Sequence, residues 1–144
     1  MGDGNEIGKP FYPIVLGILF DPETKKILIG KRKKDENIKE LTWAFPGGRP
    51  EYGEELEDSI KREIKEETNY DAESLGVIHA KTYPEKRDLL SIYFLCELTG
   101  GEGNPQDDFD EIKWVEPSEI ENYFSTSFHP RLKEYIEGLK YPGQ

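Results

Sequence analysis

Cysteine is nearly absent from the sequence: Cys96 is the one thiol in 144 residues, so the chain cannot form an intrachain disulfide. Cys96 lies among Tyr93, Phe94, Leu95 and Leu98, a run typical of a strand, and we expect a buried structural thiol there. The sequence also lacks an opening basic segment with an apolar run, and no apolar stretch approaches membrane-spanning length. We therefore expect a cytoplasmic protein that does not bind a membrane.

Positive charge is also in short supply, with 19 basic residues against 30 acidic ones and a formal net charge of -11. Such a surface repels the phosphates of DNA and RNA at long range, which disfavours a nucleic-acid partner. A small anionic ligand is not excluded, because a bound divalent cation can reverse the field around it. The plainer alternative is that the acidity serves solubility alone.

The length and the apolar content are those of a globular chain. Hydrophobic residues make up 35% of the sequence and aromatic residues 12%, and a chain of this size buries roughly two thirds of its unfolded surface without a covalent staple. We expect one domain over residues 1–144. Residues 1–9, which are polar and contain glycine, are predicted to form an N-terminal arm.

Apolar runs separated by turn residues predict a mixture of strands and helices. Strands are expected over residues 14–20, 26–32, 43–45, 73–83, 89–98 and 112–115, and helices over 53–69, 117–124 and 130–139. The turn at 21–24 would join the first two strands as a hairpin, while 33–40, 84–88 and 99–108 are predicted loops. This mixture indicates an α/β or α+β fold with a mixed sheet.

The helix predicted over 53–69 has an unusual arrangement of charge. On a helical wheel, Leu56, Ile60 and Ile64 form the stripe that must face the core. Glu63 and Glu67 fall within about 20° of Leu56, beside this stripe rather than opposite it. Partial burial of like charges is costly, and the cost falls if a divalent cation lies between them.

Three acidic residues of this helix, Glu63, Glu66 and Glu67, follow the i, i+3, i+4 spacing that makes them neighbours on its surface. A cluster of hard oxygen ligands favours magnesium or manganese. The alternative is a solvated, glutamate-rich helix in which Arg62 and Lys65 are the ion-pair partners of these acids.

A glycine-rich loop, residues 45–54, leads into the helix. Gly47 and Gly48 permit backbone conformations closed to other residues and can turn a carbonyl toward a ligand. A loop of this kind before a helix N-terminus also suits a phosphate or a metal complex. A plain turn after Pro46 is the alternative.

Loop and helix together resemble the Nudix box, G-x5-E-x7-R-E-U-x-E-E-x-G-U, in which U is a bulky apolar residue. The matching residues are Gly48, Glu54, Arg62, Glu63, Ile64, Glu66 and Glu67. Asn69 stands where the family has glycine, and Tyr70 follows as a looser match. Because asparagine also tolerates the left-handed conformation common just after a helix, we expect the turn to survive. The strands around the box and the C-terminal helix extend the resemblance over nearly the whole chain.

The resemblance implies the Nudix αβα sandwich, a mixed β-sheet between helices, and a hydrolase that uses Mg2+ or Mn2+. It implies that the carbonyl of Gly47 and the side chains of Glu63, Glu66 and Glu67 hold the cation. Arg62 would orient Glu63 through a charge-assisted hydrogen bond.

Catalysis in this family is the attack of water on phosphorus, and a carboxylate takes the proton. Within the box that base would be Glu63 or Glu67. In several members it is an acid from a later loop, for which Asp110 and Glu111 are the candidates; either could instead be a solvated charge at a strand end. Glu54 would contact the metal through water or only cap the helix.

The resemblance also implies cleavage of a phosphoanhydride bond in a nucleoside diphosphate derivative, without naming the attached group. Arg32 and Arg87 are candidates to bind a substrate phosphate. Tyr12, Phe45 and Tyr83 are candidates to stack on a base, with core packing as the alternative for Phe45.

Residues 43–48 resemble those of MutT-like nucleoside triphosphate hydrolases, so we favour a nucleoside triphosphate or a related nucleotide as substrate. Ala44 stands where the antimutator MutT has an acidic residue, which argues against specific sanitation of oxidised nucleotides. ADP-ribose or a nucleotide sugar is the alternative, because Pro84 lies near the position of a proline in the ADP-ribose class. A non-catalytic nucleotide-binding module and an RNA-end pyrophosphohydrolase are further alternatives, and a homodimer stays open.

Overall fold

The computed structural model of the protein describes residues 8–33, 42–124 and 129–139. Most of the predicted N-terminal arm and most of the loop predicted at 33–40 lie outside these ranges. Gly8 and Lys9, the described part of the arm, are exposed. Among the helices within the described ranges, none is both long and apolar enough to cross a membrane.

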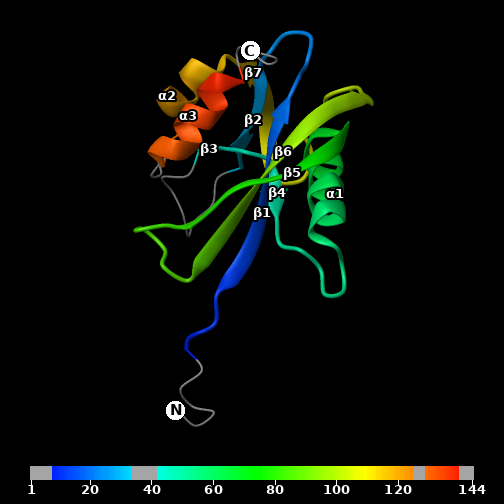
Figure 1. Ribbon diagram of the computed structural model, residues 1–144. Helices are drawn as coiled ribbons and strands as arrows, with labels where there is room; N and C mark the ends of the chain where they lie inside the picture. The colour runs from blue at the N-terminus through cyan, green and yellow to red at the C-terminus, as the bar shows by residue number, and fades with distance from the viewer. Residues whose placement is uncertain (1–7, 34–41, 125–128, 140–144) are drawn as a thin grey trace.

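The described strands form one mixed sheet in the order β3-β2-β1-β6-β5 (Figure 1). Its central strand is β1 (Tyr12–Phe20), which runs antiparallel to β2 (Ile27–Arg32) and parallel to β6 (Leu89–Gly101). The edge strand β5 (Tyr70–Thr82) is antiparallel to β6. The predicted hairpin of the first two strands and the predicted mixed sheet are both confirmed.

The remaining strands attach to β1 and β2. β3 (Trp43–Ala44) and β7 (Phe109–Val115) each pair with β2, and β4 (Gly47–Gly48) pairs with β1. The pairing of β4 with β1 brings the glycine-rich loop to the middle of the sheet.

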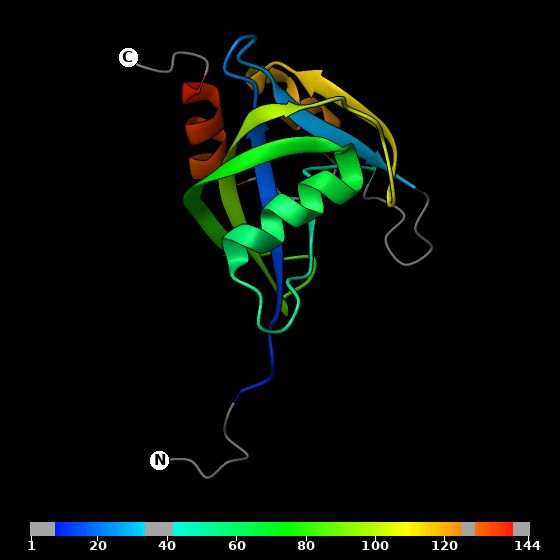
Figure 2. The ribbon, with the colours of Figure 1, turned by 90° about the vertical axis from the view of Figure 1, so that its right-hand side faces the viewer.

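Helices cover both faces of the sheet (Figures 1 and 2). On one face α1 (Leu56–Thr68) packs through Ile60 and Ile64 onto a core that includes Val15 and Phe94. The other face is covered by the short 3-10 helix η2 (Pro117–Glu119), by α2 (Ile120–Tyr123) and by α3 (Pro130–Gly138). The predicted αβα arrangement is therefore confirmed.

Helix α1 begins three residues later than predicted. Gly53 has a positive φ of 86°, and the residue before the helix, Glu55, is extended with φ -67° and ψ 141°. At the other end the prediction is confirmed, because Asn69 is left-handed with φ 62° and its backbone N–H donates to the Lys65 carbonyl. Asn69 thus adopts the left-handed conformation of this turn, at the position where the Nudix box has glycine.

Four strands, β1, β5, β6 and β7, extend beyond one of their predicted ends, and the short strand β4 was missed. β5 begins at Tyr70 rather than Glu73, and β6 continues to Gly101 rather than ending at Leu98. The pairing of β5 with β6 shifts register at several points, which breaks the alternation on which strand prediction depends. Cys96 on β6 is fully buried, as predicted, and burial raises the pKa of its thiol to about 12.

Candidate active site

Helix α1 carries the acidic residues of the Nudix box at graded depths. Glu67 is 4% exposed, next to the fully buried stripe of Ile60 and Ile64. The side chain of Glu63 is 13% exposed, whereas that of Glu66 is 45% exposed. The helical wheel predicted this order, with Glu63 and Glu67 beside the apolar stripe and Glu66 farther from it.

The buried carboxylate of Glu67 connects the helix to the glycine-rich loop. The backbone N–H of Gly47 donates to Glu67 Oε1 at 2.7 Å. Burial raises the pKa of Glu67 to about 8, and the nearby charges of Glu63 and Asp108 add to the rise. The Gly47 hydrogen bond and the positive charge of Arg32 lower this pKa, but not enough to offset burial. A buried acid next to other acids is the arrangement expected of a functional site.

Gly47 and Gly48 both lie in close approach to neighbouring atoms, and at Gly47 these atoms are backbone. A Cβ at Gly47 would lie 2.0 Å from the Val15 carbonyl oxygen, and a Cβ at Gly48 would lie 2.5 Å from Glu63 Oε2. The chain here passes directly against a neighbouring strand and against the Glu63 carboxylate. The loop is therefore part of the acidic site, which a plain turn after Pro46 would not explain.

Arg62 organises three of the carboxylates. It holds Glu54 with two hydrogen bonds, of 2.8 Å from Nε and 3.0 Å from Nη2, and donates from Nη1 to Glu63 at 2.9 Å. A longer contact of 3.2 Å reaches Glu66. The hydrogen bond to Arg62, together with one from the Glu51 backbone, lowers the pKa of Glu54 to about 2. The predicted Arg62–Glu63 hydrogen bond is confirmed.

The late acidic residue beside the helix is Asp108, which the sequence analysis did not select. Its charge raises the pKa values of both Glu63 and Glu67, for which burial is the larger cause. Its own backbone carbonyl accepts from the Lys33 N–H at 2.8 Å, at the point where the last loop meets the end of β2. The pairing of two strand ends, invisible in the linear sequence, places Asp108 here.

Glu111, selected from the sequence, is exposed on β7 and belongs to the other face of the sheet. Its charge acts on Lys113, whose Nζ lies 5.0 Å from the ring centre of Tyr123 in α2. Strand alternation separates it from Ile112 and Trp114, which pack into the core under α1. Asp110 is also exposed. The sequence analysis placed the start of β7 at Ile112, three residues too late, and the catalytic role of Glu111 stays a prediction.

The donor set of this site fits the divalent cation that the Nudix box implies. Glu63 and Glu67 are largely buried. Burial and the like charges around them raise both pKa values, so their ionised forms are disfavoured. A cation between the two carboxylates would offset this cost. Across the ranges that the structure describes, no three acidic, histidine or cysteine side chains already converge as a metal site. Arg62 engages Glu63 and Glu66, so a cation would compete with its guanidinium for these oxygens.

The residues proposed from the sequence for substrate binding lie in different environments. Arg32, at the end of β2, is close enough to Glu67 for its charge to lower the pKa of that residue. Arg87 is exposed in the turn before β6. Phe45 is 4% exposed and packs edge-to-face on Tyr93, whose hydroxyl is 2.5 Å from that of Tyr83. The role of each in binding substrate stays a prediction.

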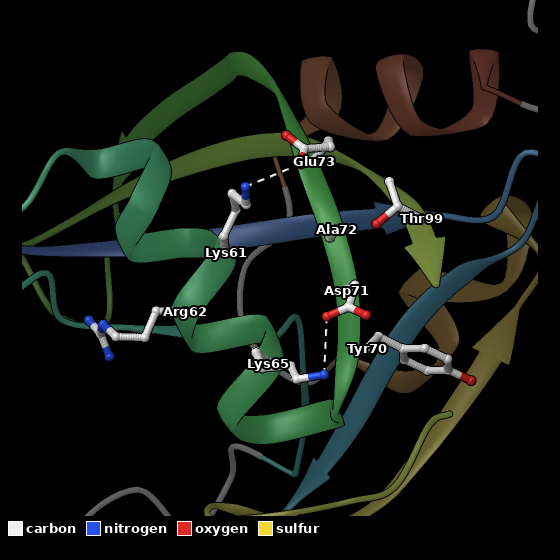
Figure 3. A pocket seen from close by; sticks show the side chains of 8 residues that line it. All are labelled: Lys61, Arg62, Lys65, Tyr70, Asp71, Ala72, Glu73 and Thr99. Atoms are coloured by element: carbon white, nitrogen blue, oxygen red, sulfur yellow. Dashed lines mark hydrogen bonds and ion pairs between the residues drawn. The ribbon is translucent and has the colours of Figure 1, made fainter. Parts of the chain in front are cut away.

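A hollow of about 330 Å³ lies on another side of α1, between the helix and β5 (Figure 3). Lys61 pairs with Glu73 at 3.2 Å and Lys65 with Asp71 at 3.1 Å across it, and all four side chains are at least 42% exposed. Arg62 points away from these pairs, toward the acidic site. Because its lysines are paired and solvated, we interpret the hollow as a seam between helix and strand.

The raised pKa of Glu67 predicts how stability depends on pH without metal. In the unfolded chain this acid ionises near its ordinary value of 4.5, whereas in the folded chain it stays protonated to about 8. The protonated Glu67 therefore stabilises the fold fully below pH 4.5, and this stabilisation, on the order of 5 kcal/mol in the free energy of unfolding, is lost as pH rises to 8. Urea denaturation in chelator, for the wild type and Glu67→Gln, isolates this contribution. We expect the variant to gain stability relative to wild type between pH 5 and 9; a difference independent of pH would contradict the assignment.

Comparison with known proteins gives a consistent result. A family model described as the NUDIX domain matches residues 10–138. A Bacillus subtilis protein provisionally named 8-oxo-dGTP diphosphatase is 29% identical over 119 residues, which cover 82% of this chain and 76% of the relative.

An ADP-ribose pyrophosphatase of Methanocaldococcus jannaschii is 36% identical over 94 residues, 63% of this chain, and the match spans 54% of that relative's length. Among solved structures, the MutT protein from Methanosarcina mazei superposes with a TM-score of 0.73 at 18% identity, covering 93% of this chain and 96% of the other. At this identity the last match supports the fold alone.

Proposed function

Because this chain belongs to the Nudix family, we propose that it is a Mg2+-dependent pyrophosphohydrolase that cleaves a phosphoanhydride bond in a nucleoside diphosphate derivative. One observation carries the proposal. The buried acid Glu67 is tied to the Gly47 backbone and lies within electrostatic reach of two further carboxylates, those of Glu63 and Asp108. Burial of the Glu63 and Glu67 carboxylates beside a packed helix costs stability, which favours a functional role for them over a structural one.

In the proposed site the cation is held by Glu63, Glu66 and Glu67 together with the Gly47 carbonyl. A cation held there would supply positive charge to neutralise the substrate's phosphates and to polarise the bond that breaks. Arg62 keeps Glu63 oriented through its 2.9 Å hydrogen bond.

We propose that Asp108 is the general base, which accepts the proton of the attacking water. This carboxylate is near Glu63 and Glu67 and is exposed, so it can pass the proton on to solvent. Glu63 and Glu67 are more buried, and a carboxylate that shares its charge with a cation is a weaker base. Asp108 therefore replaces Asp110 and Glu111 as the preferred late acid.

For the substrate we favour a nucleoside triphosphate or a related nucleotide, with ADP-ribose or a nucleotide sugar as the alternative. Relatives carry names of both kinds, an 8-oxo-dGTP diphosphatase and an ADP-ribose pyrophosphatase. Arg32, at the end of β2 and within electrostatic reach of Glu67, is placed to hold a phosphate of the substrate. The net charge of -11 disfavours a long RNA.

A substrate screen tests the proposal. The purified chain would be incubated with ATP, GTP, dGTP, 8-oxo-dGTP, ADP-ribose, a UDP-sugar and a dinucleoside polyphosphate, with Mg2+, with Mn2+ and with chelator. We expect release of a nucleoside monophosphate from at least one of these compounds, abolished by chelator. Binding of nucleotide without turnover in every case would instead identify a non-catalytic module.

A further inference from the structure

The C-terminal end of α1 is capped by the loop of residues 102–108, which joins β6 to β7. The last carbonyls of a helix lack partners within the helix itself. Here the backbone N–H groups of Asn104 and Gln106 donate to the carbonyls of Thr68 and Glu67, both at 2.9 Å. A segment about 40 positions later in the sequence thus completes the hydrogen bonding of the helix that carries the acidic residues.

Gln106 makes the largest share of these contacts. Its side-chain Nε2 donates to the carbonyls of Lys65 and Glu66, at 3.1 and 3.0 Å, while its backbone N–H donates to Glu67. Its own carbonyl accepts from the Phe109 N–H at 3.0 Å and closes a turn. Asp107, with a positive φ of 49°, and Asp108 are the two residues inside that turn.

The geometry therefore links Asp108 to α1 through Gln106. One end of the turn is held by three hydrogen bonds to the helix, and the other continues into β7, where Phe109 pairs with Arg32. Glu67 is fixed by the same contacts, since its carbonyl is one of the acceptors. Asp108 is thus connected to Glu67 by this short path, and its own carbonyl also accepts from the Lys33 N–H at the end of β2.

The remainder of the loop has an anchor of its own. A Cβ at Gly103 would meet the Tyr70 side chain, so the backbone lies directly on that ring, and Tyr70 is held by a 3.1 Å hydrogen bond from Trp114 Nε1. Asn69 Nδ2 also donates to the Glu102 carbonyl at 3.0 Å. Loss of the Gln106 side chain would consequently remove two of the three hydrogen bonds that hold residues 106–108 to α1, while residues 102–104 keep their own contacts.

We infer that Gln106 is a positioning residue for the reaction, which clamps the last turn of α1 and thereby holds the Asp108 carboxylate beside Glu63 and Glu67. This inference rests on the proposed function, because it assigns Asp108 a part in the reaction. Gln106 itself touches neither substrate nor cation. It acts through Asp108, as residues that orient a site from behind commonly do.

Gln106→Ala tests the inference, with Asn104→Ala as the matched control. Asn104 lies in the same loop and contacts α1 through its backbone N–H, which alanine keeps. We expect Gln106→Ala to lower kcat about 10- to 100-fold, the usual effect of losing such a support, with KM nearly unchanged. Asn104→Ala should keep wild-type kcat.

A double-mutant cycle with Asp108→Ala separates positioning from general stability. If Gln106 acts through Asp108, then Gln106→Ala has no further effect on kcat once Asp108 has been replaced. An equal loss of kcat in both backgrounds would overturn the inference, and so would an unchanged kcat in the single variant.

Amide hydrogen exchange in the metal-free protein gives a readout that needs no activity. Gln106→Ala should speed exchange at the amides of residue 106 and Phe109, which donate to the carbonyls of Glu67 and residue 106, while the buried amides of Ile60 and Ile64 keep their wild-type protection. Faster exchange throughout α1 would indicate a structural role instead. A wild-type chain that hydrolyses no nucleotide would overturn the proposed function as well, whereas an active wild type with an unaffected Gln106→Ala overturns the positioning role alone.

Discussion

Glu67→Gln is expected to lower kcat at least about a hundredfold with Mg2+ present, the minimum scale for losing an acid–base or metal-binding group. Glutamine matches the size of glutamate, and its side-chain oxygen can still accept the Gly47 N–H, so the 2.7 Å link between loop and helix survives. What is lost is the negative charge at the most buried of the three Nudix-box acids on α1. Steady-state kinetics on the best substrate of the screen measures kcat, and circular dichroism checks that the fold is kept.

Glu57→Gln is the matched control for this variant. Glu57 is an exposed glutamate in the first turn of the same helix, so its replacement removes one charge from α1 without touching the site. We expect its kcat to stay within about twofold of wild type, as for most surface substitutions. Near-normal turnover in Glu67→Gln itself would remove the central assignment.

Gly47→Ala is expected to damage stability and activity together. The new Cβ would lie 2.0 Å from the Val15 carbonyl oxygen and 2.9 Å from Leu16 Cα, and both neighbours are backbone atoms of the central strand. Because neither can rotate away, β4 must separate from β1, and the Gly47 N–H leaves Glu67. We expect the free energy of unfolding to fall by about 3 kcal/mol and kcat to fall at least about a hundredfold.

Gly138→Ala provides the comparison for this prediction. An added Cβ at Gly138, in the last turn of α3, meets nothing within 4 Å, and alanine is the better helix former. It should therefore be neutral or slightly stabilising in chemical denaturation and should keep full activity. If Gly47→Ala behaved in the same way, the close approach of the loop to β1 would not matter for the site.

Much of the site could be predicted from the sequence because it lies on one helix and its entry loop. The period of α1 fixes which side chains share a face, so the burial of Glu67 and the exposure of Glu66 follow from spacing alone. The Arg62–Glu63 contact and the left-handed Asn69 are equally local. Each involves residues within one or two turns of each other.

The parts that were missed depend on contacts between distant segments. The strand β4 consists of two glycines, and it exists because β1 offers backbone partners to it. Asp108 reaches the site because β7 pairs with β2 and the preceding loop caps α1. Neither pairing leaves a periodic signal in the sequence, so Glu111, which is near Asp108 in sequence but lies on the opposite face of the sheet, was chosen instead.

The burial of Cys96 has a practical consequence for following the loop of residues 102–108 in solution. With the thiol fully enclosed and its pKa raised to about 12, the folded protein offers maleimides and other thiol reagents no reactive sulfur. A cysteine introduced at the exposed Asn104 would then carry the sole fluorophore or spin label, and the native cysteine need not be removed first. Spectroscopy on that probe would report on the segment that leads to Asp108 as nucleotide and cation are added.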